Sequence, residues 1–283
     1  MSKSGTRTRV IAALVMAPFA IGAILLLPTP WLSALAALVF LIGLWEWFKL
    51  AEIDDTLSRT VLLLLNLLLM VLLVWASAGS LVLFQIVTLV GVAWWLLALL
   101  WLRFFSFASN HESYARAFKL LAGTLAIVPA WCALCLIHAS QPNGHIWLFI
   151  ALAIVWAADS GAYFAGRGLG GKLFAGRKLA PRISPNKTIE GLLGGVVAGM
   201  LVAAVGLYVA GGDTAQLPGV LLVALATVLF SVIGDLFESL IKRHVGAKDS
   251  GHLIPGHGGV LDRIDGVLAA LPVFALGKEI FGF

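Results

Sequence analysis

Nine apolar stretches occupy most of the 283-residue chain, and each is about 16 to 22 residues long. Because a helix rises ~1.5 Å per residue, about 20 such residues cross the ~30 Å hydrocarbon layer of a bilayer. Only 12% of the residues are charged, against about 25% in soluble domains, so a water-soluble domain is excluded. We therefore predict an all-α, polytopic integral membrane protein. The predicted spans are 10–27, 31–50, 61–76, 81–102, 120–137, 146–164, 189–210, 218–234 and 267–283.

The basic residues favour one orientation. With the N-terminus in the cytoplasm, every one of the 19 Lys and Arg residues except Lys278 falls on the cytoplasmic side. This is the positive-inside pattern of membrane proteins. The first span lacks a small-residue cleavage site, so it is interpreted as an uncleaved anchor. The net charge of +5 therefore reports topology, and no nucleic-acid partner is expected.

The charge pattern divides the chain into two predicted parts. Residues 1–140 hold about five almost purely apolar spans and are interpreted as a transmembrane scaffold. Residues 141–283 hold about four spans, two long cytoplasmic loops and acidic residues near span ends. The chemistry is expected in this second part.

Acidic residues in or near spans need a reason, because an ionised carboxylate at the centre of a spanning helix costs about 2.5 to 3.5 kcal/mol. Asp159 and Asp235 each end an apolar run, and each could simply mark the water interface. Asp235 and Glu238 are three residues apart, as are Asp262 and Asp265, so each pair shares a face if its helix continues. Oxygen-only carboxylate clusters suit Mg²⁺, which also binds waters and substrate phosphates.

Two loops contain residues suited to phosphate. Segment 246–259 has five glycines together with Lys248, Ser250, His252 and His257. Successive backbone N–H groups in such a segment can bind an anion, although a flexible linker is the alternative.

Segment 166–187 has six basic residues and no acidic one. Its glycines formally match G-x-G-x-x-G and most of a P-loop, but they follow a span rather than a strand. Residues 184–188 resemble a helix start, where a positive helix end beside Lys187 could hold an anion. The loop could equally serve topology or attract anionic lipid.

Two other features are interpreted as structural. Cys132 and Cys135 have C-x-x-C spacing inside an apolar run without a βαβ context, which favours two buried thiols one turn apart. Glu46 lies between tryptophans and is most simply an interfacial residue paired with Lys49.

Several motifs of the second part together resemble a known signature. They are SLIKR at 239–243, KDSGH at 248–252 and PGHGGVLDRID at 255–265, with DSGAY at 159–163, SPNKTIEG at 184–191 and GDLFES at 234–239. This long pattern of fixed spacing resembles the phosphatidate cytidylyltransferase family, also called CDP-diacylglycerol synthases. The first part matches mainly in span count and length.

The resemblance implies a bacterial inner-membrane transferase of phospholipid biosynthesis. Such an enzyme joins CTP to phosphatidic acid and produces CDP-diacylglycerol and pyrophosphate. It also implies a homodimer and a polar, metal-containing cavity that opens to the cytoplasm and toward the lipid. The expected cofactor is Mg²⁺, alone or with a second cation.

On this basis we expect an in-line attack of a phosphatidate oxygen on the α-phosphorus of CTP, aided by metal. The metal ligands would be Asp235, Asp262 and Asp265, with Asp159 and Glu238 completing or orienting the site. Lys248 and Arg263 join the three aspartates in the expected catalytic set, and with Lys242 and Arg243 they would hold the CTP phosphates. Lys187 and Arg182 would receive the lipid phosphate. The further substrate-binding residues expected are Ser184, Thr188, Ser239, Asp249, His257, Gly258 and Gly259.

Two alternatives differ in chemistry. A CTP-dependent polyprenol or phytol kinase would also need a basic loop and a metal, but the long signature favours the cytidylyltransferase. A cation transporter would explain Asp159 and Asp235, yet its site should lie near the midplane of repeated halves. Here the acidic residues cluster toward one side, and the phosphate-like loops would be unexplained.

Overall fold

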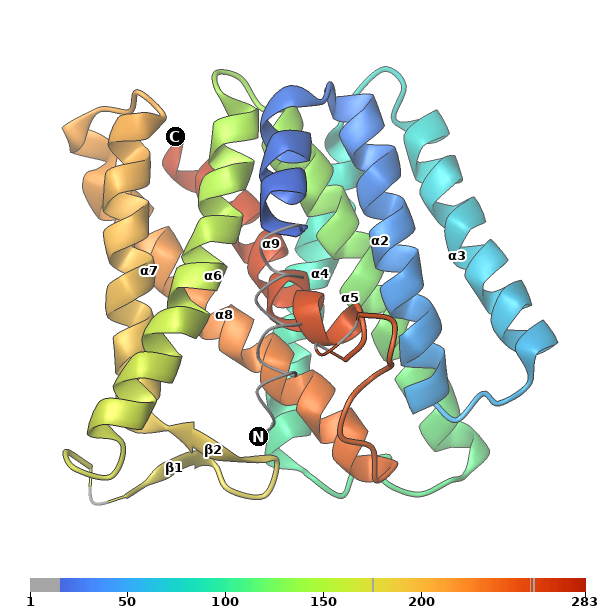
Figure 1. Ribbon diagram of the computed structural model, residues 1–283. Coiled ribbons are helices and arrows are strands. Elements are labelled where there is room, and N and C mark those ends of the chain that lie inside the picture. Colours follow the sequence, from blue (N-terminus) through green and yellow to red (C-terminus); the bar gives the residue numbers. More distant parts are fainter. Residues whose placement is uncertain (1–15, 175, 255, 257) are drawn as a thin grey trace.

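Helices form most of the computed structural model, which describes residues 16–174, 176–254, 256 and 258–283 (Figure 1). A short apolar helix, Met16–Leu26, comes first. The longer helices are α2 (Thr29–Leu50), α3 (Thr56–Ala76), α4 (Val82–Arg103), α5 (Ser113–Ala139), α6 (Gly144–Leu169), α7 (Ile189–Val209), α8 (Leu217–His244) and α9 (Leu261–Phe281). Strands β1 (Lys178–Ala180) and β2 (Ser184–Thr188) form an antiparallel hairpin between α6 and α7, and a 3-10 turn η1 (Thr214–Gln216) precedes α8.

Seven of the predicted spans are confirmed as helices that are long and apolar enough to cross a membrane. They are α2 to α7 and the continuous stretch Thr214–His244, which contains α8. The first predicted span begins outside the described residues, and its described part is only the short helix Met16–Leu26. The chain is therefore an all-α polytopic membrane protein.

The last predicted span, 267–283, is not confirmed as a membrane-crossing helix. Helix α9 is not among the described helices that are apolar enough to span, and it carries charged residues near both ends. Its middle, from Gly266 to Ala275, is nevertheless continuously buried against other helices. Figure 1 shows that it starts within the height of the bundle, above the β-hairpin. Protein rather than lipid surrounds the middle of this helix, and the charged residues lie toward its two ends.

Local sequence explains where several helices begin. Pro30 and Pro218 stand in the first turns of α2 and α8, where a missing backbone N–H costs nothing. The Asp55 carboxylate accepts the Ser58 backbone N–H at the start of α3. The Thr188 hydroxyl accepts the Gly191 N–H at the start of α7. These caps bind backbone donors that a helix start leaves unpaired.

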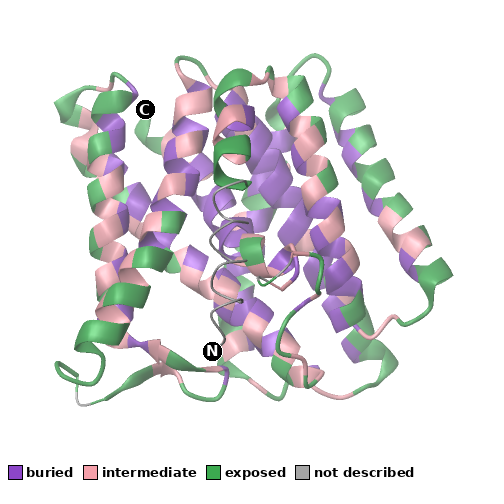
Figure 2. Cartoon of the chain, in the orientation of Figure 1, coloured by how far each residue is buried: buried purple, intermediate pink, exposed green. Residues whose placement is uncertain are grey.

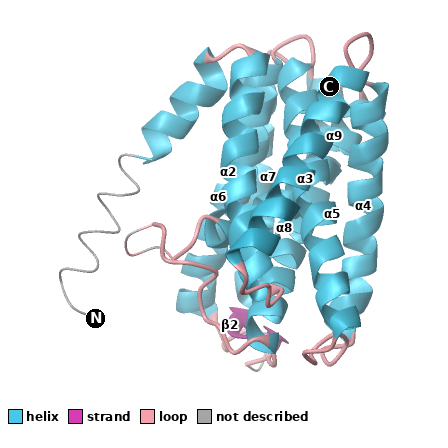
Figure 3. Ribbon diagram, turned by 90° about the vertical axis from the view of Figure 1, so that its right-hand side faces the viewer, coloured by secondary structure: helices cyan, strands magenta, loops and turns pink. Residues whose placement is uncertain are grey.

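The loops with most of the basic residues lie at one end of the bundle. The α2–α3 and α4–α5 connections, the β-hairpin and the end of α8 all lie at the bottom of Figure 1. The opposite end carries the short turns at 27–28, 77–81 and 140–143. Figure 3, turned by a quarter, also shows β2 at the lower end. The loops that carry most of the basic residues in the sequence thus lie together at one end of the bundle.

The buried core lies around α5 and α9, whereas α3 is largely exposed on the outside of the bundle (Figure 2). Helix α9 packs against α2, α4 and α5 as well as α8, so the two predicted parts of the chain share one core. Cys132 and Cys135 are buried and unlinked one turn apart in α5, as predicted.

Candidate active site

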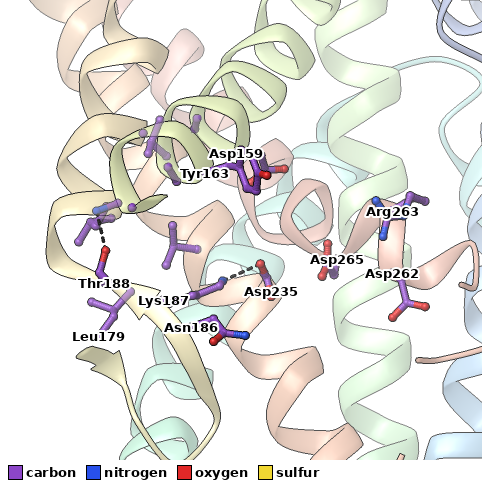
Figure 4. Close-up of a pocket in the computed structure, with 18 of the residues that line it drawn as sticks. Asp159, Tyr163, Leu179, Asn186, Lys187, Thr188, Asp235, Asp262, Arg263 and Asp265 are labelled. Carbon is purple, nitrogen blue, oxygen red and sulfur yellow. Dashed lines mark hydrogen bonds and ion pairs between the residues drawn. The ribbon is translucent and has the colours of Figure 1, made fainter. Parts of the chain in front are cut away.

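A cavity of about 500 Å³ lies among α6, α7, α8, the start of α9 and the β-hairpin (Figure 4). It contains most of the charged residues that the sequence predicts for the site. The predicted site residues that line it are Asp159, Lys187, Thr188, Asp235, Lys242, Asp249, Asp262, Arg263 and Asp265. Five elements separated by up to a hundred residues therefore meet at one polar space.

Asp159 and Asp235 lie further inside their helices than the sequence indicates. Helix α6 continues from Asp159 to Leu169, and α8 continues from Asp235 to His244, about 14 Å at the helical rise. The predicted span ends at 164 and 234 were therefore too early. Both carboxylates line the cavity wall rather than marking the ends of their helices.

Glycines bring α7 close to α6 beside Asp159. A Cβ on Gly161 would collide with the backbone of Gly194, and a Cβ on Gly195 would collide with the backbone of Ala158. Small residues of this kind let two membrane helices approach closely. The start of α7, with Thr188 and Lys187 before it, is thereby held against the same wall as Asp159.

Two lysines form ion pairs with carboxylates in and beside the cavity. The ammonium of Lys187 lies 2.6 Å from Oδ2 of Asp235, and Ser239 donates a 3.3 Å hydrogen bond to the other oxygen. The ammonium of Lys242 lies 2.6 Å from Glu238 and 2.7 Å from Asp262. Buried carboxylates need such partners, because an unpaired buried charge is strongly destabilising.

Asp262 also holds the glycine-rich segment that precedes α9. Its carboxylate accepts the backbone N–H of Ser250 at 3.0 Å and that of Gly259 at 2.7 Å. Gly258 has a positive φ of 83°, and a Cβ there would collide with the same carboxylate. This segment therefore wraps an aspartate of its own chain.

Asp265 and its neighbours are the best candidates for holding a cation. Asp265 lies within electrostatic reach of both Asp235 and Glu238. Carboxylates so placed repel unless a proton or cation joins them. In the described part of the chain, no three His, Cys, Asp or Glu side chains converge as a metal site. Mg²⁺ usually needs only one or two carboxylates besides waters and substrate phosphates, so this donor set fits an ion that binds together with a nucleotide.

Other predicted site residues do not line the cavity. Arg243 donates to the backbone oxygen of Ile183 at 3.1 Å, and the guanidinium of Arg182 lies 4.6 Å from the centre of the Phe105 ring. Both hold the β-hairpin in place. Lys248 is exposed beside the cavity residue Asp249. The other predicted site residues that do not line the cavity are Ser184, Glu238, Ser239, Gly258 and Gly259. His257 lies outside the described residues.

The turn at 171–174, at the end of the glycine-rich segment, directs its backbone N–H groups to a side chain of the protein. The N–H groups of Gly171, Leu173 and Phe174 point to Oε1 of Glu190, at 3.0, 3.4 and 3.2 Å. Glu190 is almost fully buried. The anion at this turn is thus a side chain of the protein, which the sequence analysis did not foresee.

The interpretation of Glu46 as an interfacial residue paired with Lys49 is wrong. Glu46 is buried, with 5% of its surface exposed, whereas Lys49 is exposed. Its carboxylate accepts hydrogen bonds from Ser250 and Leu261, more than 200 residues away. The available signal was a glutamate within an aromatic run, inside the predicted span 31–50 rather than beyond its end.

The chain is similar to known proteins over nearly its whole length. The profile of the cytidylyltransferase family matches residues 7–281. A phosphatidate cytidylyltransferase of Pseudomonas aeruginosa is 39% identical over 271 residues, covering 95% of each chain. That of Haemophilus influenzae is 35% identical over 286 residues, covering 95% of this chain and 97% of the relative. That of Staphylococcus haemolyticus is 33% identical over 273 residues, covering 96% of both. The chain therefore belongs to the cytidylyltransferase family.

Proposed function

We propose that this protein transfers the cytidylyl group of CTP to phosphatidic acid and releases CDP-diacylglycerol and pyrophosphate. The observation that carries the proposal is the convergence of the signature residues on one charged cavity. Full-length similarity to relatives named for this reaction supports the choice of substrates.

The reaction needs little covalent chemistry from the protein. A phosphatidate oxygen forms a bond to the α-phosphorus of CTP, and the bond from that phosphorus to the bridging oxygen breaks as pyrophosphate leaves. The nucleophile is already anionic, so no strong base is required. Positioning and neutralisation of charge therefore supply most of the rate, as in other phosphoryl-type transfers.

The cavity has separate cationic groups for the two substrates. Lys187, on the β-hairpin, is placed to receive the lipid phosphate, with Arg182 on the same hairpin. Lys242 and Arg263 face the cavity from α8 and α9 and would bind the nucleotide phosphates, with Arg243 and Lys248 nearby. The lysines are now bound to carboxylates, so a substrate phosphate would compete for an ammonium that is already in position.

A bound Mg²⁺ would supply positive charge to the phosphates of CTP. One or two of Asp235, Asp262 and Asp265 would hold it together with the nucleotide phosphates, with Asp159 and Glu238 orienting the site. Asp159, Asp235, Asp262 and Asp265 share the cavity with Lys242 and Arg263. A second cation is compatible with this number of carboxylates.

We place the cavity on the cytoplasmic side of a bacterial inner membrane, where CTP is present. The clustering of basic loops at one end of the bundle supports this sidedness. The homodimer implied by the resemblance can be tested by light scattering of the detergent-solubilised protein.

The decisive assay uses purified protein with phosphatidate, Mg²⁺ and CTP labelled either in cytosine or in the γ-phosphate. We expect the cytosine label in the lipid fraction and the γ-label in pyrophosphate. A polyprenol or phytol kinase, given its isoprenoid alcohol in a parallel reaction, would instead put the γ-label in lipid and leave the cytosine label in CDP. Metal-dependent ion flux across vesicles without a labelled lipid would instead indicate a transporter.

A further inference from the structure

We infer that Glu46, in the first half of the chain, is a positioning residue for the active site, acting through Ser250 on Asp262. This inference rests on the proposed function, because Asp262 belongs to the site proposed above. Glu46 contacts the segment 246–260, which joins α8 to α9, without lining the cavity itself.

Glu46 binds this segment directly. Its Oε2 accepts a hydrogen bond of 3.1 Å from the Ser250 hydroxyl and one of 2.8 Å from the Leu261 backbone N–H. Both Glu46 and Ser250 are 5% exposed. Hydrogen bonds to an ionised acceptor are about twice as strong as neutral ones, more so away from water. Helix α2 thus fixes a loop that is distant in sequence.

The carboxylate also caps α9 from another helix. Leu261 is the first residue of α9, and the residue before it, Val260, provides no side-chain cap. Unpaired N–H groups and the positive end of the helix dipole favour an anion at this position. Glu46 therefore fixes where α9 begins, and with it the place of Asp262 one residue later.

Two glycines make room for Glu46. A Cβ on Gly251 or on Gly259 would collide with its carboxylate oxygens. Gly251 and Gly259 therefore pack directly against this side chain. In such close packing, a shorter residue at position 46 would leave a void and free the segment to move.

Ser250 joins Glu46 to the cavity. Its hydroxyl donates to Glu46, while its backbone N–H donates to Asp262, whose carboxylate binds Lys242 at 2.7 Å. A displacement of Ser250 therefore changes the position of Asp262 and of the Lys242 ammonium. Misplacement of reacting groups by ~1 Å can cost about 100-fold in rate.

Glu46 has a cost that a simple packing role does not explain. Among the described residues, no Lys, Arg or His side chain forms an ion pair with it. A buried carboxylate without a cation is destabilising, and an apolar residue of similar size would pack at lower cost. The hydrogen bonds to Ser250 and Leu261 are contacts that an apolar residue at this position could not make.

The test compares Glu46→Ala, Glu46→Gln and Ser250→Ala with wild type. Steady-state kinetics are measured for CTP and for phosphatidate in detergent, after folding is checked by thermal unfolding and size exclusion. For Glu46→Ala we expect the KM for CTP to rise about 10-fold and kcat to fall about 10-fold, with the KM for phosphatidate unchanged. Glu46→Gln keeps an acceptor oxygen and should restore the KM for CTP to within about threefold.

A structural defect would have a different signature, because a smaller folded fraction lowers the apparent Vmax and leaves both KM values unchanged. Glu52→Gln is the matched control. It alters a carboxylate just beyond α2 that binds Lys119 and His111 instead of the 246–260 segment. We expect this control to lower stability without changing either KM.

An unchanged KM for CTP in folded Glu46→Ala would overturn the inference. Should that variant not fold, Ser250→Ala provides the same test with a smaller change, and an unchanged KM for CTP there would overturn it too. The double variant should lose no more than Glu46→Ala alone, whereas additive losses would contradict action through Ser250. Failure of the wild type to form labelled lipid would instead refute the proposed function.

Discussion

The ammonium of Lys187 lies 2.6 Å from a carboxylate oxygen of Asp235, so the β-hairpin is closed against the middle of α8 by one ion pair. The lysine is only a quarter exposed, and both residues line the cavity. This pair places a cation for phosphate at the junction of a loop and a membrane-spanning helix.

Replacing Lys187 with Ala should weaken the use of phosphatidate more than that of CTP. Loss of one charged hydrogen bond of roughly 1.5 kcal/mol corresponds to about a 10-fold rise in the phosphatidate KM. Steady-state kinetics with each substrate varied in turn would measure it. Lys172→Ala, a lysine of the same connection that does not line the cavity, serves as the control. A raised KM for CTP with unchanged lipid dependence would reverse the allocation of the two substrates.

Asp262→Asn should reduce cytidylyl transfer by at least about 100-fold while the protein remains folded and inserted. The amide keeps the size of the side chain but removes the charge that binds Lys242 and a cation. Asp213→Asn, at the turn before η1, is the matched control, because Asn also caps helix starts well. Near-normal turnover of Asp262→Asn would refute its assignment to the metal site.

Removal of Mg²⁺ with a chelator should abolish turnover, and added Mg²⁺ should restore it. Binding should also be visible without catalysis, as a rise in the thermal unfolding midpoint when Mg²⁺ and CTP are added together. Asp265→Asn should lose this rise, because its carboxylate is one of those expected to hold the ion. An equal rise in wild type and variant would place the ion elsewhere.

The Glu52 ion pairs should make stability depend on acid pH. Burial raises the pKa of Glu52, but its hydrogen bonds and ion pairs with Lys119 and His111 lower the pKa by more. The net result is a pKa below the ordinary value of 4.5. Since the folded-state pKa is the lower one, the pairs stabilise the fold above about pH 4.5. Their contribution is lost as the pH falls through the folded-state value.

Thermal unfolding of wild type and Glu52→Gln across pH 3 to 7 tests this dependence. The wild type should be the more stable protein at neutral pH, and the difference should disappear in acid. A difference that stays constant over the whole range would show that the charge of Glu52 is not responsible.

The long helices could be predicted from sequence because each must bury about 20 apolar residues in lipid. The boundaries were less certain, since α6 and α8 continue past the predicted ends at 164 and 234. The extension of α8 is tied to the hairpin by Arg243 and to α9 by Lys242, contacts that hydropathy does not indicate. The predicted span 267–283 stays unconfirmed, because the middle of α9 is buried in protein.

The sequence by itself determined the membrane class, the sorting of basic residues and most of the charged residues that share the cavity. These properties can be predicted from the sequence because apolar length, charge and motif spacing are local features of the chain. They do not depend on contacts with distant residues. Only the tertiary structure decided which acceptor each donor found: Lys187 with Asp235, the 171–174 turn with Glu190, and Ser250 with Glu46. Such pairings depend on close approach between helices that are distant along the chain, and hydrogen bonds and ion pairs act only at that range.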